Sequence, residues 1–255
     1  MKNFKTSLVF VLLGLLLFSC KKATTKTSKP VSFSVLKTTE KIIIDGKMNE
    51  AIWKKSAICS LPNFYNYKKA SETQKTAFRM LWDDKNLYLF FQCEDQYINA
   101  KETKRDGLPF LDDCVEFFLI PAPEPLNMHF CFEVNANKAI NDIVFLNNIY
   151  NGKDTAIKSF NPEIEIEVDI NGTVNNNSDI DKGWSMEFSI PLKSFNRMNE
   201  FHPIAEGTNW SYLVVRQDRN KLDTEDRTTS TNFKIENFAE KDVHQPTMFG
   251  LLEFK

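Results

Sequence analysis

The feature of this chain that most restricts its fold is the alternation of apolar and polar residues with a period of two. In residues 163–170 apolar Ile and Val side chains alternate with acidic ones, and residues 130–135 and 184–190 repeat the pattern. Successive side chains of a β-strand point to opposite faces, so the pattern predicts strands with one buried face. Convincing helical segments are short, at residues 49–56 and just after Pro191. We therefore predict an all-β fold: a jelly-roll-like β-sandwich of two mainly antiparallel sheets with few short helices.

A hairpin is the clearest local element of this prediction. Residues 76–82 and 87–91 are strand-like, and the turn-forming sequence 83–86 joins them. No internal repeat or linker interrupts the later part of the chain, so residues 38–255 are predicted to form one sandwich domain. Three tryptophans lie on the apolar side of their elements and should be buried in it: Trp53, Trp82 and Trp184.

The N-terminus has the pattern of an export signal. Lys2 and Lys5 form a positive segment, residues 8–18 are almost wholly apolar, and residues 17–20 read Leu-Phe-Ser-Cys, a lipobox. As a helix, eleven residues rise about 16 Å, roughly half of the hydrocarbon core of a bilayer, so this run is too short to span a membrane. The pattern is typical of a bacterial lipoprotein signal.

A lipoprotein signal divides the N-terminal region into two parts. Residues 1–19 would be removed, and the thiol of Cys20 would carry the lipid. The polar stretch after it cannot bury a core, so residues 20–37 are predicted to be a lipidated cysteine followed by a flexible leash. We expect the mature protein in the bacterial cell envelope, held by its lipid at the outer membrane or on the periplasmic or surface side.

The charge balance excludes one class of partner. The formal net charge is −2 at pH 7, and loss of Lys2 and Lys5 with the signal makes it −4. No basic stripe occurs in the sequence, so nucleic acid is not an expected partner.

Four cysteines besides Cys20 remain after processing. Their spacings match no zinc pattern, and three lie within apolar, strand-like runs, which indicates buried free thiols. Export permits disulfides, and four cysteines allow three pairings among which the sequence does not choose. The four are Cys59, Cys93, Cys114 and Cys131.

A series of short motifs resembles family 9 carbohydrate-binding modules. The motifs occur in the family's order and cover residues 38–255. They are Ile44-Asp45-Gly46 with residues 49–53; residues 81–84 with 86–88; Asp113-Cys114-Val115-Glu116 with two phenylalanines; residues 132–135; Gly183-Trp184 with Glu187 and Ile190-Pro191; and Pro246 with Phe249-Gly250. The resemblance implies a β-sandwich that binds poly- or oligosaccharide.

The resemblance also implies positions for sugar contacts. An aromatic residue that stacks on the sugar lies six residues before the glutamate of the D-x-V-E strand, which makes these Phe110 and Glu116. Phenylalanine here replaces the family's usual tryptophan. Asn135 matches a hydrogen-bonding position, and Glu133 stands where better-known members carry an arginine.

The other candidates lie outside that strand pair. His244 precedes the Pro246 motif where a second stacking aromatic is usual, and Arg105 is a candidate polar contact. A structural pairing of Glu116 with Arg79 or Arg105 is the alternative to a role in binding. The predicted sugar site therefore comprises Phe110, Glu116, Glu133, Asn135, Arg105 and His244, with Tyr65, Tyr67 and Phe233 as replacement platforms.

The sequence contains no catalytic signature. G-x-S-x-G, P-loop, H-E-x-x-H and G-x-G-x-x-G patterns are all missing, so we predict a non-catalytic module. Because such modules often accompany glycoside hydrolases, we expect a role in carbohydrate catabolism, with glycoside hydrolases or sugar-uptake proteins as partners.

Three other interpretations stay open. Residues 175–181 offer oxygen donors that suit a structural calcium ion, although such a run is also typical of a solvated loop. Met128, His129, His244 and Met248 supply the residue types that ligate haem in an electron-transfer sandwich, without a C-x-x-C-H motif. An envelope scaffold or adhesion domain without a small ligand is the third.

Overall fold

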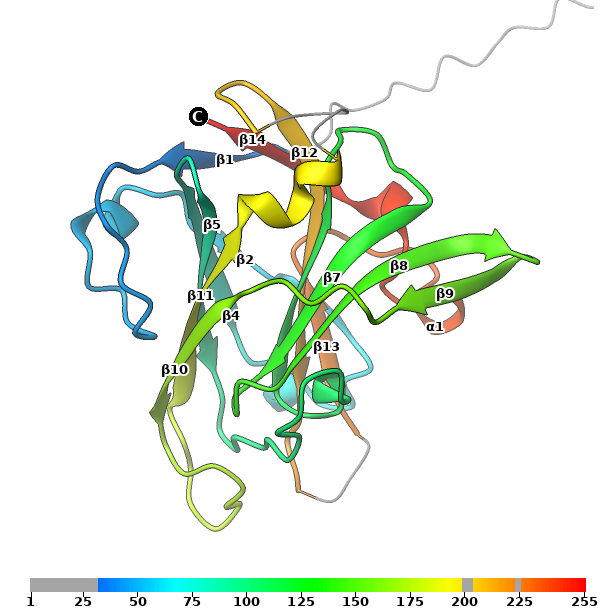
Figure 1. The fold of residues 1–255 in the computed structure, drawn as a ribbon. Helices are drawn as coiled ribbons and strands as arrows, with labels where there is room; N and C mark the ends of the chain where they lie inside the picture. The colour runs from blue at the N-terminus through cyan, green and yellow to red at the C-terminus, as the bar shows by residue number, and fades with distance from the viewer. Residues whose placement is uncertain (1–31, 199–203, 223–225) are drawn as a thin grey trace, which may run out of the picture.

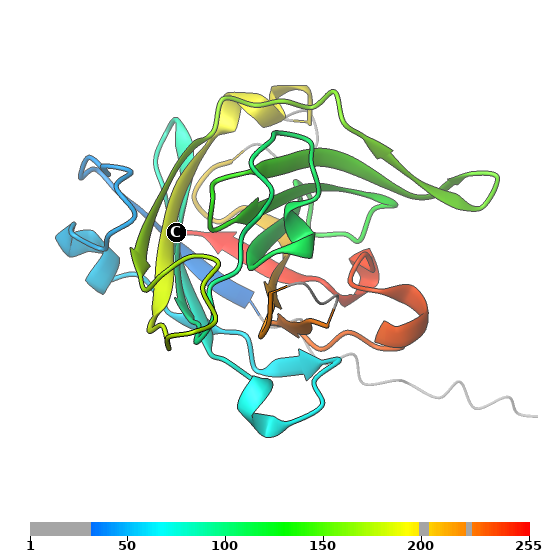
Figure 2. The same ribbon diagram turned by 90° about the horizontal axis from the view of Figure 1, so that it is seen from below.

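The computed structural model describes residues 32–198, 204–222 and 226–255, which form two facing β-sheets (Figure 1, Figure 2). Sheet A runs in the order β14 (Gly250–Phe254), β12 (Asn209–Asp218), β6 (Cys114–Ile120), β7 (Met128–Asn135), β8 (Ile140–Tyr150) and β9 (Lys153–Ile157), with β13 (Thr228–Thr231) and β3 (Asn63–Tyr65) continuing it beside β12. Sheet B runs β10 (Glu165–Asn171), β11 (Gly183–Pro191), β5 (Asn86–Glu94) and β4 (Thr76–Trp82), with β2 (Cys59–Ser60) beside β4. The predicted all-β class is confirmed.

Strand β1 (Ser32–Lys37) joins the two sheets. Its first part pairs in parallel with β14, and its last two residues pair in parallel with β4. All other strand pairs among the described residues are antiparallel. The sandwich thus includes residues 32–37, which precede the predicted boundary at residue 38, and Phe33 and Val35 bury their side chains in the core. The predicted signal, Cys20 and the leash up to residue 31 lie outside the described residues.

The main core lies between the sheets. Its aromatic side chains come from both: Phe78, Phe91 and Phe188 belong to sheet B, and Phe117 and Phe132 to sheet A. The burial predicted for the three tryptophans is confirmed, with exposed fractions of 0% for Trp53 and 3% for Trp82 and Trp184.

Helical segments in the part of the chain that the structure describes are short, as predicted. They are the 3-10 helices η1 (Ala51–Lys54), η2 (Ala70–Glu72), η3 (Pro109–Leu111), η4 (Leu192–Met198) and η5 (Pro246–Met248), and the α-helix α1 (Phe238–Lys241). Among the described residues, no helix has the length and apolar character needed to cross a membrane. All four described cysteines are free thiols: Cys93, Cys114 and Cys131 are buried, and Cys59 is half-buried.

The outward faces of the two sheets are covered to different extents. Over sheet B, the segment that contains η1 packs Trp53 against Tyr88 and Phe90, while the end of the sheet near Ser60 and Asn171 is left uncovered. Over sheet A, the segment from Ile235 to Phe249 covers apolar residues of β6, β7, β8 and β12.

Candidate functional site

A row of polar side chains crosses the outward face of sheet A. Strand pairing sets Glu116 of β6 directly opposite Glu133 of β7, and Glu133 opposite Asn141 of β8. Asn141 Nδ2 donates to Glu133 Oε2 at 2.7 Å, and Gln217 Nε2 donates to Glu116 Oε1 at 2.9 Å. Thr229 Oγ1 completes the row by donating to Gln217 Oε1 at 2.7 Å. We call these five residues the polar row.

The two glutamates share one buried environment. Their exposed fractions are 2% for Glu116 and 4% for Glu133. Burial, and after it the charge of Glu133, raise the pKa of Glu116 well above its usual range, and burial likewise raises the pKa of Glu133. Directly opposite residues place their Cβ atoms about 5 Å apart, so two full negative charges would repel strongly. A pair that retains one proton offers both a hydrogen-bond donor and an acceptor.

Phe110 and Arg227 lie on the same side of the sheet. The half-buried ring of Phe110, on η3, has the guanidinium carbon of Arg227 5.7 Å from its centroid, and Arg227 Nη1 donates to the Phe110 carbonyl at 2.9 Å. The charge of Arg227 acts on both glutamates and lowers their pKa values against the larger effect of burial. The structure thus brings together three predicted residues, Phe110, Glu116 and Glu133.

The predicted structural partners of Glu116 are wrong. Arg79 donates instead to the carbonyl of Ser56, and Arg105 pairs with Asp142. The hydrogen-bond partner of Glu116 is the amide of Gln217.

Asn135 belongs to the structure of a loop rather than to an open site. Its Nδ2 donates to the Glu102 carbonyl at 2.9 Å and to Asp112 Oδ2 at 2.8 Å. Its Oδ1 accepts from the backbone N–H of Asn137 at 3.1 Å and of Ala139 at 2.8 Å. An amide side chain has two donor hydrogens and two acceptor lone pairs, and all four are used here. The Asn135 side chain therefore has no free donor or acceptor with which to make the predicted sugar contact.

Arg105 is directed to the other face of sheet A. It donates to Asp142 and, through Nε, to Asn161 Oδ1 at 2.7 Å. Asp142 follows Asn141 on β8, so it points away from the polar row, and it is paired with the core residue Phe132. Arg105 therefore does not join the predicted site.

His244 lies in an aromatic cluster at the other end of the same face. Its ring stacks on Phe145 with centroids 4.1 Å apart and on Phe118 at 4.9 Å. Its Nδ1 is 3.0 Å from His129 Nε2, so the two histidines share a hydrogen bond. Burial lowers the pKa of both, which favours neutral imidazoles. Phe145 and Phe118 occupy the ring faces of His244 on which a sugar would stack, and the nitrogens His129 Nε2 and His244 Nδ1, which could ligate haem iron, are bonded to each other.

The calcium candidate, residues 175–181, uses its oxygens within the protein. Asn175 Oδ1 accepts from the N–H of Ala100 at 2.9 Å. Asp181 accepts from the N–H of Thr173 at 2.7 Å and of Ile98 at 2.9 Å. These bonds attach the loop to the segment around residue 98. The side chains of Asn175 and Asp181 therefore have a structural role in the loop.

A second acidic group is buried at one end of the sandwich. Carboxylate oxygens of Asp95, Asp113 and Asp218 lie within 4.8 Å of one another. The guanidinium of Arg216 lies among them, its Nη2 at 2.7 Å from Asp95, 3.0 Å from Asp218 and 3.4 Å from Asp113, and its carbon lies 4.7 Å from the Trp184 ring centroid. Burial raises the pKa of Asp113 well above its usual range and that of Asp218 to about 6. The three carboxylates form ion pairs with Arg216, so we interpret the group as a buried ion network.

Sequence reasoning missed four members of the site: Gln217, Asn141, Thr229 and Arg227. Gln217 had a detectable signal, because Arg216, Gln217 and Asp218 form a polar run at the end of an otherwise apolar strand. The other members depend on strand register, which joins segments far apart in the chain.

Comparison with known proteins agrees with the fold and the motifs. The described residues form a two-sheet sandwich with a polar row and an adjacent aromatic ring on one outward face. The profile of the family described as "Carbohydrate family 9 binding domain-like" matches residues 44–255, and the chain belongs to this family. The family is one of carbohydrate-binding modules, which are typically non-catalytic. The resemblance predicted from the motifs is confirmed.

Solved structures show the same fold at low sequence identity. A family 9 module from Caldicellulosiruptor kristjanssonii in complex with cellotriose superposes with a TM-score of 0.59 at 19% identity, covering 88% of this chain and 94% of that one. The same organism's module in complex with glucose gives 0.57 at 19% identity, covering 87% and 95%. A candidate carbohydrate-binding protein from Bacteroides uniformis gives 0.60 at 17% identity, covering 89% and 100%. No curated protein matches the sequence.

Proposed function

We propose that this protein is a non-catalytic carbohydrate-binding lipoprotein of the bacterial cell envelope, which holds an oligosaccharide or polysaccharide in support of carbohydrate catabolism. The observation that carries the proposal is the pairing of Phe110 and Arg227 with the glutamates of the polar row, in a chain whose family binds sugars. The lipobox that ends at Cys20 supports the envelope location.

Each group at the site has a role that sugar chemistry requires. The ring of Phe110 would face the apolar C–H side of a pyranose. Arg227 would donate to the sugar hydroxyls, and the buried pair of Glu116 and Glu133 beneath it would set the local charge. The cellotriose and glucose complexes of the Caldicellulosiruptor modules support neutral glucans as a first ligand class to test.

The affinity should be modest. A phenylalanine offers less area than a tryptophan, and an aromatic contact contributes about 0.5–1.5 kcal/mol beyond its buried area. A total of ~4–8 kcal/mol corresponds to dissociation constants between millimolar and micromolar.

Retention on immobilised polysaccharides tests the site. We expect Phe110→Ala to lose about tenfold in affinity, since that factor corresponds to ~1.4 kcal/mol. Leu111→Ala is the matched control, because Leu111 is exposed on the same η3 turn. Wild-type retention by Phe110→Ala would remove this ring from the site, and no retention by the wild type on any glycan would favour a scaffold.

Fractionation tests the anchor. Cys20→Ala should shift the protein from the membrane fraction to a soluble or unprocessed form, because several acyl chains each add ~0.8 kcal/mol per buried CH₂. A mutant that is processed and fractionates with membranes like the wild type would contradict lipidation. Co-purification with glycoside hydrolases or sugar importers tests the proposed partners.

A further inference from the structure

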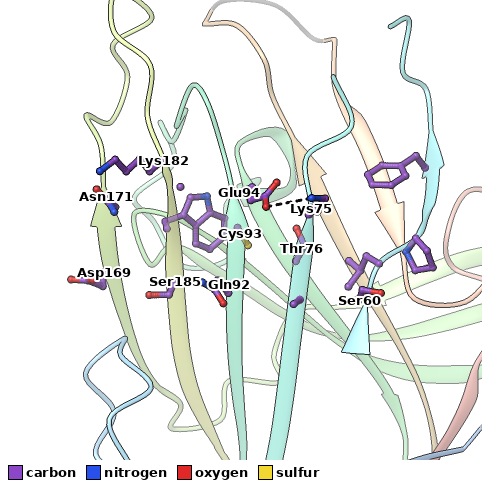
Figure 3. Close-up of a pocket in the computed structure, with 16 residues that line it drawn as sticks. Ser60, Lys75, Thr76, Gln92, Cys93, Glu94, Asp169, Asn171, Lys182 and Ser185 are labelled. Atoms are coloured by element: carbon purple, nitrogen blue, oxygen red, sulfur yellow. Dashed lines mark ion pairs between the residues drawn. The ribbon is translucent and has the colours of Figure 1, made fainter. Parts of the chain in front are cut away.

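A groove lies on the uncovered end of the outward face of sheet B (Figure 3). Its volume is about 660 Å³, within the roughly 300–1,000 Å³ typical of ligand sites. Strands β10, β11, β5 and β4 form its floor, and the segment from Ser60 to Phe64, where the chain passes from sheet B toward sheet A, closes one end. It shares no lining residue with the polar row.

The floor of the groove is a straight line of small and polar side chains. Strand register aligns one residue from each of five strands, and strands lie about 4.8 Å apart, so the line is roughly 19 Å long. The aligned residues are Asp169, Ser185, Gln92, Ala77 and Ser60. A line of this length fits an extended chain better than a single small molecule.

Two side-chain amides in the lining of the groove are free to bond a ligand. Among the described residues, the side-chain amides of Gln92 and Asn171 have no hydrogen-bond partner, and Gln92 is exposed at the centre of the groove. Ser185 Oγ, by contrast, donates to the Gly46 carbonyl at 2.7 Å. Free amides each offer two donors and an acceptor that a ligand can take from water without breaking a bond within the protein.

The charges of the groove balance one another. Lys75 Nζ lies 3.9 Å from Glu94 Oε1, as the dashed line in Figure 3 marks, and Asp169 Oδ1, at the β10 end of the floor, lies 3.7 Å from Lys47 Nζ. Among the described residues, Lys182 is the one other charged residue that lines the groove, so positive and negative charges nearly balance there. A polyanion would need a groove with an excess of positive charge, and an apolar partner would need a larger apolar surface than residues 61–64 provide. A neutral, hydroxyl-rich chain therefore fits best.

We infer that this groove is a second carbohydrate-binding surface, which takes an extended neutral oligosaccharide through Gln92 and Asn171. The inference rests on the proposed function for the ligand class, and it assigns a separate site. A half-buried Phe64 and an exposed Pro62 give the groove an apolar end for the C–H face of one sugar ring.

Calorimetric titration tests the groove with hexasaccharides of β-1,4-glucan, xylan and mannan. We expect two sites per chain for the hexasaccharide that binds, and a loss of at least fivefold in affinity at one of them in Gln92→Ala and Asn171→Ala. Gln96→Ala is the matched control, because Gln96 is an exposed amide just beyond β5 and outside the groove lining.

The outcomes separate the two proposals. Loss of one site in the groove variants, with the other retained and Gln96→Ala unchanged, supports the inference. A wild type that binds one hexasaccharide per chain, with the groove variants unchanged, overturns the groove and leaves the proposed function standing. A wild type that binds none of the three contradicts the proposed function and the groove with it.

Discussion

The outward faces of the two sheets carry similar residue types in opposite states. On sheet A, the amides of Asn135, Asn141 and Gln217 are buried and bonded to protein atoms. On sheet B, the side-chain amides of Gln92 and Asn171 are exposed and make no hydrogen bond to any described residue. The difference separates amides that are already satisfied within the protein from amides whose hydrogen bonds are free for a ligand.

The two states carry different costs on binding. A ligand that takes a hydrogen bond from a paired, buried amide leaves the former partner unsatisfied, at about 1–3 kcal/mol. A ligand that meets an exposed amide displaces only water. On sheet A, the half-exposed Phe110 and Arg227 are therefore the groups available for contact, and the glutamate pair beneath them sets the local charge.

The largest expected difference is in stability. Asn135→Ala removes one hydrogen bond each from two backbone N–H groups, the Glu102 carbonyl and the Asp112 carboxylate, so we expect the free energy of unfolding to fall by ~2–4 kcal/mol. Asn171→Ala removes an exposed amide and should change it by about 0.5 kcal/mol or less. Urea denaturation of both variants measures the contrast. Equal losses would show that the two faces do not differ as described.

We expect the glutamate pair to have an intermediate effect on stability, one that depends on pH. The folded-state pKa values of Glu116 and Glu133 are raised above the unfolded value of about 4.3, so the folded state keeps protons that the unfolded state releases. The free energy of unfolding therefore falls as pH rises from about 4 through the raised pKa values.

Glu133→Gln removes one member of the pair and keeps an oxygen for Asn141. The stability of this variant relative to the wild type should increase between pH 5 and pH 8, as denaturation at each pH measures. Exposed Glu94→Gln on sheet B is the matched control. A constant difference across that range would mean that the pair stays ionised throughout.

The smallest expected differences in stability are those between two residues of the groove, Ser185 and Gln92. Ser185→Ala loses the bond to the Gly46 carbonyl and should cost ~0.5–1.5 kcal/mol, whereas Gln92→Ala should cost about 0.5 kcal/mol or less. Thermal denaturation of the two variants under the same conditions measures the difference. A larger loss for Gln92→Ala would show that its amide has a structural partner.

The alternation of residues was enough to predict the sheets, the hairpin at residues 83–86 and the buried tryptophans, because burial on one face of a strand is a local property. The start of the sandwich was set too late, since β1 is held by pairing with the distant strands β4 and β14. A six-residue stretch of mixed polarity gives no sign of such partners.

The sites were predictable only in part, for the same reason. Motif spacing indicated Phe110, Glu116 and Glu133, yet Arg227 reaches them from a distant segment. Asn135 and Asn171 both appear in the sequence as an asparagine at a strand end, and only the folded loop shows that the first is fully bonded. The groove arises from the register of five strands and has no local signature.

The most direct test of the account is the NMR spectrum of the side-chain amides during titration with the hexasaccharide that binds. The account predicts shifts for the NH₂ groups of Gln92 and Asn171 and for the Arg227 side chain, with little change for the NH₂ group of Asn135. Shifts at Asn135 without shifts at Gln92 and Asn171 would contradict it, because a ligand would then be exchanging with the paired face and leaving the free amides untouched.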